Sequence, residues 1–220
     1  MSRDTKAMLR NKYILWDWNG TLLDDTRAAF NTLNIMLKKR GVKPIAMEFY
    51  LDNFAFPVKP FYESIGMVLD NENWDDLAIE YHDIYAAQNK VLNVEAIAAL
   101  EKVRLCGVGQ SIISALRQDL LRKATDSFGV RKYLDYVYGV DNLDGCSKID
   151  RAKELLDKIR GEHVEELDIV LIGDSLHDKE VADMLGVGCV LCSQGSHAHW
   201  RLEKVAPTCR DLLSAVECAI

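Results

Sequence analysis

Five short runs of apolar residues are distributed along the chain, and segments with helical spacing separate most of them. The runs are rich in β-branched and aromatic residues, which is typical of strands buried on both faces of a parallel sheet. We therefore predict five strands, at residues 13–16, 110–114, 136–139, 169–172 and 189–192.

Amphipathic segments alternate with these runs from the second one onward. Residues 116–128, 147–159 and 176–185 have helical patterns, and a glycine follows each, as is usual at helix C-termini. A final helix is expected to start at the cap residue Thr208. Because strands alternate with helices, the sequence predicts an α/β fold with a doubly wound, Rossmann-like parallel sheet of five strands.

The pattern is different between the first and second strands, where residues 25–92 are helical throughout. Thr26 is a candidate cap and Gly41 a candidate stop for a first amphipathic helix, and residues 73–90 form a second. This segment is far longer than a single crossover helix. We therefore expect a helical domain at 25–92, inserted into a core domain made of residues 1–24 and 93–220.

Composition and charge narrow the classes of function. The formal net charge of −7 argues against a nucleic-acid-binding surface. The N-terminal residues lack the apolar segment of a signal peptide, and no apolar run is long enough to span a membrane. Most of the six cysteines lie in apolar runs, and Cys189 and Cys192 fall on opposite faces of a strand, which favours core packing over zinc or redox chemistry. We expect a cytoplasmic protein, whose oligomeric state the sequence does not indicate.

Polar side chains follow four of the predicted strands, at the edge of the sheet where the chemistry of such folds collects. Each of them alone fits a helix cap or a solvated residue, but their common placement at one edge favours a site. They are Asp17, Asn19, Gly20 and Thr21 after the first strand, Ser114 after the second, Lys148 after the third, and Asp174 and Asp178 after the fourth.

These residues stand in motifs that resemble those of the haloacid dehalogenase-like hydrolases, most closely the phosphoglycolate-phosphatase-like branch. "ILWDWNGTLLDD" is similar to the family's first motif, DxDGT, and "IVLIGDSLHDKEVADMLG" to its fourth, GDxxxD followed by a helix. "SIIS" and "SKIDRAKELL" are similar to the second and third. The resemblance covers nearly the whole chain, and the insert matches the helical cap domain of this family.

The resemblance implies a phosphatase that hydrolyses a small-molecule, phosphoglycolate-like phosphate monoester. Asp17 would attack phosphorus and form an aspartyl-phosphate. Asp17, Asp174 and the backbone carbonyl of Asn19 would hold Mg²⁺, a cation that prefers oxygen ligands. Lys148 and the Ser114 hydroxyl would neutralise the phosphoryl oxygens. Asp178 would orient Lys148 or a metal-bound water. Gly20 and Thr21 would shape the turn.

Asn19 departs from the family pattern. Phosphatases of this family carry an aspartate at this position, which protonates the leaving alcohol and then activates water. An amide forms hydrogen bonds but cannot carry the proton, and such acid–base help is worth about 10²–10⁴-fold in rate.

Asn19 therefore leaves three interpretations open. The first is a phosphatase that either is slow or uses another acid, such as His177, Asp24 or a residue of the insert. The second is a phosphoryl-transfer or phosphonate-cleaving enzyme, and the third is a catalytically weakened phosphate-binding protein. The true dehalogenases of the superfamily also lack an aspartate at this position, but "GDSLHD" favours a metal site and therefore argues against that class.

Substrate contacts are expected from the insert. The stretch "FAFPVKPFYESIG" offers Phe56 and Lys59 as candidates, although a packed turn with one exposed lysine explains it equally well. His197 and His199 lie in a polar loop, where solvated side chains are the favoured interpretation.

Overall fold

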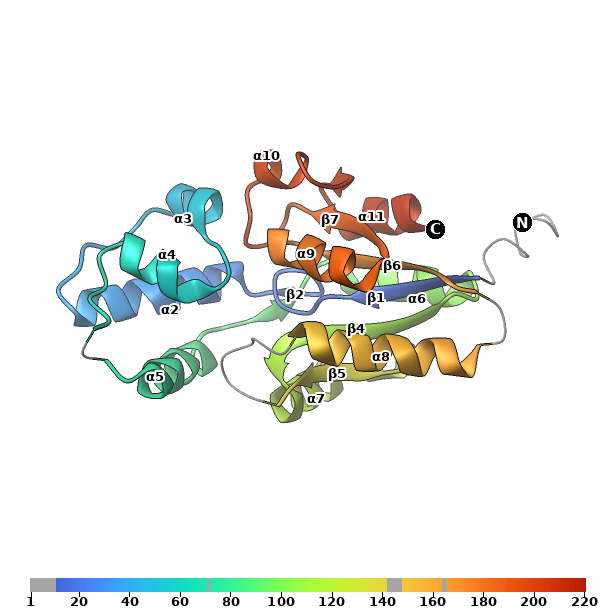
Figure 1. Cartoon of the computed structure of the whole chain (residues 1–220), viewed down its shortest axis with the longest axis horizontal. Coiled ribbons are helices and arrows are strands. Elements are labelled where there is room, and N and C mark those ends of the chain that lie inside the picture. The colour runs from blue at the N-terminus through green and yellow to red at the C-terminus, as the bar shows by residue number, and fades with distance from the viewer. Residues whose placement is uncertain (1–10, 71, 142–147, 164–165) are drawn as a thin grey trace.

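The chain forms a parallel sheet with helices on both faces and a group of helices beyond one end of the strands (Figure 1). The computed structural model describes residues 11–70, 72–141, 148–163 and 166–220. The strand order is β5-β4-β1-β6-β7-β8, and every neighbouring pair is parallel. The strands are β1 (Lys12–Trp16), β4 (Gly109–Arg117), β5 (Val137–Val140), β6 (Asp168–Gly173), β7 (Gly188–Cys192) and β8 (Thr208–Cys209).

The five predicted strands are present, and the sheet has a sixth. Thr208, predicted as a helix cap, instead pairs with Leu191 in the two-residue strand β8. The last helix, α11 (Leu212–Ala219), begins later, and the Asp211 side chain caps it by accepting a hydrogen bond from the Ser214 N–H at 2.7 Å. A strand of two residues is too short to show a periodic pattern, so the sequence pattern missed it.

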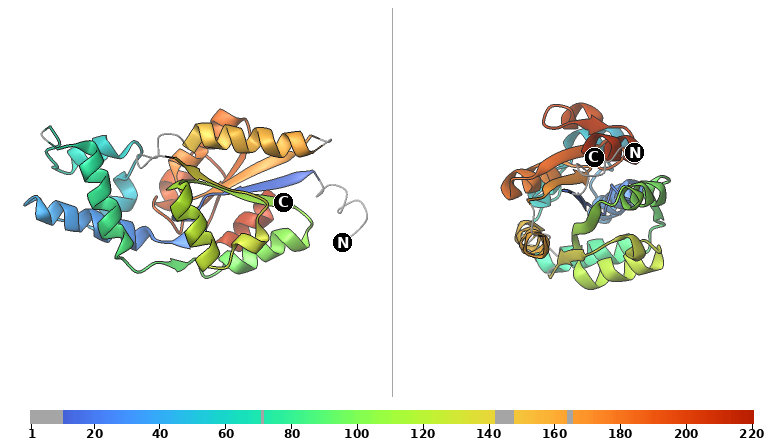
Figure 2. Two further views of the ribbon diagram at one scale, coloured as in Figure 1. Left: turned by 90° about the horizontal axis from the view of Figure 1, so that it is seen from below. Right: turned by 90° about the vertical axis from the view of Figure 1, so that its right-hand side faces the viewer.

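Alternate residues of the strands enter two separate hydrophobic cores. In β1, Ile14 and Trp16 pack under α6 (Ala96–Leu105), α7 (Gln118–Ser127) and α11, whereas Tyr13 and Leu15 pack under α8 (Lys148–Glu162) and α9 (Leu176–Leu185). Figure 2 shows these two layers of helices on opposite sides of the sheet. Both faces of the sheet are therefore covered, as the continuous apolar runs predicted.

The structure confirms the predicted packing of Cys189 and Cys192 but not the predicted end of α8. Cys189 and Cys192 belong to opposite cores, which confirms that they pack as apolar side chains. Helix α8 continues through Gly161 to Glu162 instead of stopping before the glycine, because a glycine near a helix end costs only about 1 kcal/mol. The predicted start of this helix at Ser147, like the N-terminal segment considered for a targeting signal, lies outside the described residues.

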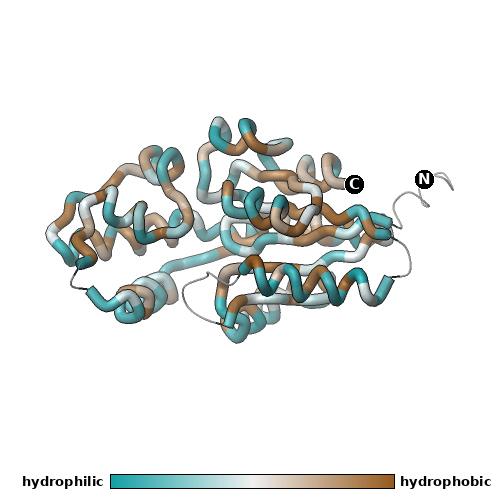
Figure 3. The backbone as a smooth tube through the Cα atoms, in the orientation of Figure 1, coloured by the Kyte–Doolittle hydropathy of each residue, from teal (hydrophilic) through white to brown (hydrophobic). Residues whose placement is uncertain are grey.

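Four helices lie between residues 25 and 90 and are hereafter called the helical insert: α2 (Thr26–Lys39), α3 (Met47–Asn53), α4 (Val58–Ser64) and α5 (Trp74–Ala86). They alternate hydrophobic and hydrophilic positions (Figure 3) and share a core of their own that includes Leu33, Tyr50 and Phe61. Asp25, not Thr26, is the residue before the first helical turn of α2.

Two of the sets of contacts that join the helical insert to the rest of the chain lie at the ends of the insert and at a short helix. The strands β2 (Leu23–Asp24) and β3 (Val91–Leu92) pair antiparallel where the chain enters and leaves the insert. The short helix α10 (His199–Leu202) supplies the second set, because Arg201 Nη1 donates to the carbonyls of Leu51 and Phe54, each at 2.9 Å. The insert is thus anchored over the carboxyl end of the sheet.

Among the described residues, the longest helices are amphipathic, and none combines the length and apolar character needed to cross a membrane.

Candidate active site

Asp17 directly follows β1 at the carboxyl end of the sheet. Its N–H donates to the Ile172 carbonyl at 2.9 Å, which extends the pairing of β1 with β6 by one residue. The backbone then turns at Asn19 and Gly20, where Gly20 has a φ of +78°. This turn holds the Asp17 carboxylate, which is 5% exposed, at the centre of the edge predicted from the sequence.

Lys148 brings two carboxylates together from different elements. Its Nζ lies 2.5 Å from Asp17 Oδ1 and 2.7 Å from Asp178 Oδ1, and all three side chains are buried. Burial alone would lower the pKa of Lys148, but the two carboxylates raise it overall. Lys148 therefore remains a buried ammonium ion at the base of the site.

Asp178 is fixed by the first turn of α9. Its Oδ2 accepts hydrogen bonds from the N–H groups of Asp174 and Ser175, at 3.1 and 3.0 Å, and from the Ser175 hydroxyl at 2.6 Å. Burial raises the pKa of Asp178, but the Lys148 ammonium and these hydrogen bonds outweigh it and lower the pKa overall. Asp178 is thus an ionised group that orients Lys148.

Asp174 is held by the loop that follows β7. Its Oδ2 accepts from the Ser196 N–H and hydroxyl, each at 2.6 Å, and Thr21 Oγ1 lies 3.3 Å from Oδ1. Burial and the neighbouring Asp178 carboxylate raise the pKa of Asp174. No motif indicated Ser196, although the loop after the fifth predicted strand lies at the same edge of the sheet as the other four loops.

The carboxylates have the composition of a metal site. Asp17, Asp174 and Asp178 offer oxygen atoms within 4.8 Å of one another, and the Lys148 ammonium pairs with two of them, Asp17 and Asp178. Burial and the two other carboxylates raise the pKa of Asp17, an effect that Lys148 opposes. Buried oxygen ligands with an excess of negative charge fit a hard divalent cation, and Asp17 and Asp174 are the candidate ligands because Asp178 is already satisfied.

The Asn19 amide points toward the helical insert. Its Nδ2 donates to Asp25 Oδ2 at 2.7 Å and to the Tyr85 hydroxyl at 3.0 Å, and Tyr85 also donates to Asp25. Asp25 Oδ1 accepts from the Gly20 N–H at 2.7 Å, and burial raises the pKa of Asp25 above its ordinary value. A buried carboxylate therefore lies beside residue 19, a contact that no local sequence pattern indicated.

A cavity of about 220 Å³ lies between the strand ends and the helical insert. The residues that line it at the sheet side include Asp17, Ser114, Lys148 and Asp174, which the structure brings together as predicted. Ser114 lies within β4, not after its end as predicted, because the strand continues to Arg117 past a register shift that begins after Ile113. Its Oγ accepts from the Leu116 N–H at 3.1 Å.

Some of the other residues predicted from the sequence line this cavity, and others do not. Phe56 and His177 line it, whereas Lys59 is exposed and is not among the lining residues, and neither is the exposed Asp24. His197 is buried instead of solvated: its Nδ1 accepts from the Leu176 N–H at 3.0 Å, and burial lowers its pKa to about 4.

Comparison with known proteins gives one family. Residues 14–192 match the model of the haloacid dehalogenase-like hydrolase family. No curated protein matches the sequence.

Solved structures with the same fold share little sequence with this chain. A haloacid dehalogenase-like family hydrolase from Streptococcus pneumoniae has a TM-score of 0.75 and 18% identity, over 94% of this chain and 97% of that one. A predicted phosphoglycolate phosphatase from Haemophilus somnus has a TM-score of 0.72 and 16% identity, over 97% of this chain and 100% of that one. Protein tyrosine kinase A from Mycobacterium tuberculosis has a TM-score of 0.75 and 19% identity, over 96% of this chain and 98% of that one. At these identities the likeness concerns the fold.

The turn at Gly20 gives a first prediction. A Cβ at Gly20 would lie 2.4 Å from Asp174 Oδ2, whereas one at Gly41, which has a similar φ of +71°, would meet no atom within 4 Å. Both Gly20→Ala and Gly41→Ala place an alanine in a strained left-handed backbone conformation, but only Gly20→Ala also displaces the Asp174 side chain. We expect Gly20→Ala to lower the free energy of unfolding, measured by urea denaturation, by about 1–3 kcal/mol more than Gly41→Ala. Equal losses would contradict the assigned packing.

The Asn19–Asp25 contact gives a second prediction. Asn19→Asp replaces a donor by a second carboxylate 2.7 Å from Asp25 and should cost about 1–3 kcal/mol in the free energy of unfolding at neutral pH. Combining it with Asp25→Asn exchanges the positions of carboxylate and amide, and should recover most of that loss. Urea denaturation of the single and double variants measures this coupling, and additive losses would show that the two residues do not interact.

Proposed function

Because the chain belongs to the haloacid dehalogenase-like hydrolase family, we propose that it is a Mg²⁺-dependent phosphatase acting on small-molecule phosphate monoesters. The observation that carries this proposal is the buried Asp17–Lys148–Asp178 arrangement beside Asp174, which opens onto a cavity large enough for a small ester. We further propose that residues 25–92 act as a cap domain on a core made of residues 1–24 and 93–220.

Asp17 is the proposed nucleophile. A carboxylate oxygen of Asp17 attacks phosphorus, and the bond from phosphorus to the ester oxygen breaks. The products are an aspartyl-phosphate and an alkoxide, which takes its proton from solvent. Water then attacks phosphorus, so that inorganic phosphate leaves and the Asp17 carboxylate is regenerated. Lys148 lies within 2.5 Å of Asp17 Oδ1, a position from which its ammonium can neutralise a phosphoryl oxygen. The Ser114 hydroxyl is placed to donate to another.

The proposed cation site supplies the remaining positive charge. Asp17, Asp174 and the backbone carbonyl of Asn19 would hold Mg²⁺, as the family resemblance implies. The bound ion would neutralise negative charge on the phosphoryl group. Asp178 keeps its proposed role of orienting Lys148, because its oxygens already accept from that side chain and from the first turn of α9. Gly20 and Thr21 keep the carboxylates of Asp17 and Asp174 close together.

The leaving alcohol receives no proton from residue 19. The amide of Asn19 donates to Asp25 and Tyr85, so it neither carries nor relays a proton to the ester oxygen. The activation barrier of the first step therefore depends strongly on how stable the departing oxyanion is by itself. The proposed enzyme is a slow phosphatase for simple alkyl esters, because the general acid help that an aspartate at residue 19 would give, worth about 10²–10⁴-fold, is missing.

Trapping the covalent intermediate tests the proposal. Wild-type protein incubated with Mg²⁺ and acetyl phosphate, an activated phosphoryl donor that needs no acid, should gain one phosphoryl group on the peptide that contains Asp17. Asp17→Asn, which keeps the shape of the side chain, should abolish this label and reduce turnover by at least about 10³-fold. Peptide mass spectrometry after acid quenching measures the label.

Asp183→Asn is the matched control, because Asp183 is an exposed carboxylate on α9 outside the cavity. It should retain the label and the turnover of the wild type. Turnover by Asp17→Asn at the wild-type rate would exclude the aspartyl-phosphate mechanism. Binding of inorganic phosphate with neither label nor turnover would instead favour a phosphate-binding protein.

A further inference from the structure

The helical insert gives the cavity an aromatic wall. Tyr50, Phe54, Phe56, Tyr62, Trp74, Tyr81 and Tyr85 all line it, together with the aliphatic side chains of Leu33, Val58 and Leu77. The rings contact one another, with the centroids of Tyr50 and Phe54 stacked at 4.8 Å and those of Tyr81 and Tyr85 stacked at 5.8 Å. Such a surface favours a flat, apolar group, because aromatic pairs gain free energy beyond the area that they bury.

Few basic side chains are available to bind a negatively charged leaving group. Lys148 is the one lysine or arginine among the described residues that line the cavity, and Asp17 and Asp178 already hold its ammonium. Lys90 donates to the carbonyls of Tyr85 and Gln88, at 2.6 and 2.8 Å. A leaving group with a carboxylate would therefore be buried without a cationic partner, which is costly.

The other titratable groups at the cavity do not change this balance. His177 Nδ1 contacts Glu180 at 3.2 Å and its ring packs on Phe56, and His82 packs edge-on against Tyr81. Asp25 adds a further acid to the lining. A second anion on the substrate would meet these carboxylates, so the cavity favours an uncharged leaving group.

The missing acid at residue 19 is independent evidence for the chemistry of the leaving group. Without proton donation, an ester is cleaved readily only when its oxyanion is stable by itself. The hydroxyl of a phenol has a pKa of about 10, as in tyrosine, and so leaves far more easily as an anion than an aliphatic alcohol does. Asn19 and the aromatic wall therefore favour the same class of ester.

We propose that the substrates are aryl phosphates, in which an uncharged aromatic ring is bonded directly to the ester oxygen, and not carboxylate-bearing esters such as phosphoglycolate. This inference rests on the proposed phosphatase function and deepens it. The ring lies against the insert side of the cavity with its phosphate at Lys148.

Binding of two phosphonates measures the preference without turnover. Phenylphosphonate carries the ring, phosphonoacetate carries the carboxylate, and neither has an ester bond. Calorimetric titration of each into the Mg²⁺-loaded wild type should give a dissociation constant at least about tenfold lower for phenylphosphonate. In parallel, kcat/KM should fall in the order phenyl phosphate, benzyl phosphate, phosphoglycolate, since benzyl phosphate keeps the ring but has an aliphatic ester oxygen.

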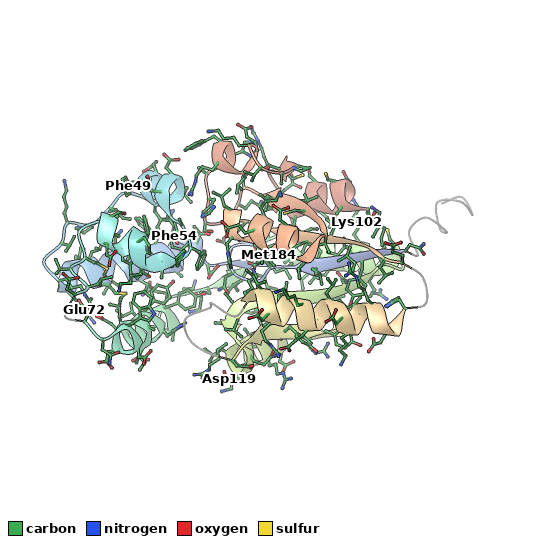
Figure 4. The ribbon with its side chains drawn as sticks, in the orientation of Figure 1. Phe49, Phe54, Glu72, Lys102, Asp119 and Met184 are labelled. Carbon is green, nitrogen blue, oxygen red and sulfur yellow. The ribbon has the colours of Figure 1, made fainter. Side chains whose placement is uncertain are left out.

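A pair of arginine variants tests the position of the wall. Phe56 lines the cavity, whereas Phe49 lies on α3 outside it (Figure 4), and the two are exposed by 41% and 43%. Phe56→Arg should shift the ratio of the two dissociation constants toward phosphonoacetate by at least about threefold, since a partly exposed ion pair contributes up to about 1 kcal/mol. Phe49→Arg should leave the ratio unchanged.

The possible failures have different meanings. Phosphonoacetate binding as tightly as phenylphosphonate, or phosphoglycolate as the better substrate, would overturn the aryl preference and leave the phosphatase function standing. An equal shift in both arginine variants would overturn the assignment of the wall. Failure of the wild type to bind inorganic phosphate or either phosphonate, with no ester hydrolysed, would contradict the proposed function on which the inference rests.

Discussion

The buried ammonium of Lys148 is the interaction on which the rest of the site depends. Lys148 lies on α8, the helix that follows β5. Its ammonium contacts Asp17 at the end of β1 and Asp178 in the first turn of α9, so it connects these two elements. Transferring three ionic groups from water to a protein interior is costly, and only close geometry and additional hydrogen bonds compensate. The backbone N–H groups at α9 and the Ser175 hydroxyl provide those hydrogen bonds for Asp178.

The same arrangement leaves negative charge unbalanced. One ammonium faces the carboxylates of Asp17, Asp174 and Asp178, and Asp25 lies on the other side of the first turn. Replacing buried ionic groups by well-packed apolar residues often leaves the stability of a protein unchanged or raises it. A cation bound between the carboxylates would balance this charge. In the function proposed above, that cation and Lys148 would together bind the phosphoryl group.

Much of this site was predictable from the sequence, for a topological reason. Once apolar runs and helical segments alternate, the sheet is parallel, and the residues after each strand must meet at one edge. Asp17, Ser114, Lys148 and Asp174 followed from this rule and the motifs. The rule predicts which residues are near one another, but it says nothing of side-chain directions, so the orientation of Asn19 toward Asp25 came only from the structure.

The contacts that escaped prediction all depend on tertiary structure. Tyr85 reaches Asp25 because α5 packs above the first turn, and no local spacing encodes that approach. The strand β8 exists because Thr208 lies beside β7, not because of its own propensity. Lys59 was predicted to contact substrate because it lies in the most unusual stretch of the insert, yet it is exposed and is not among the residues that line the cavity. The insert side of the cavity is lined mainly by apolar side chains that look like ordinary core residues in the sequence.

Calorimetric titration of Mg²⁺ tests the central claim most directly, namely that the carboxylates around Lys148 form a divalent-cation site. The account predicts that the wild type binds one ion per chain at neutral pH, and that Asp174→Asn, which removes a charged ligand but keeps its shape, weakens binding at least about tenfold. Binding that is absent in the wild type, or unchanged in Asp174→Asn, would contradict the account.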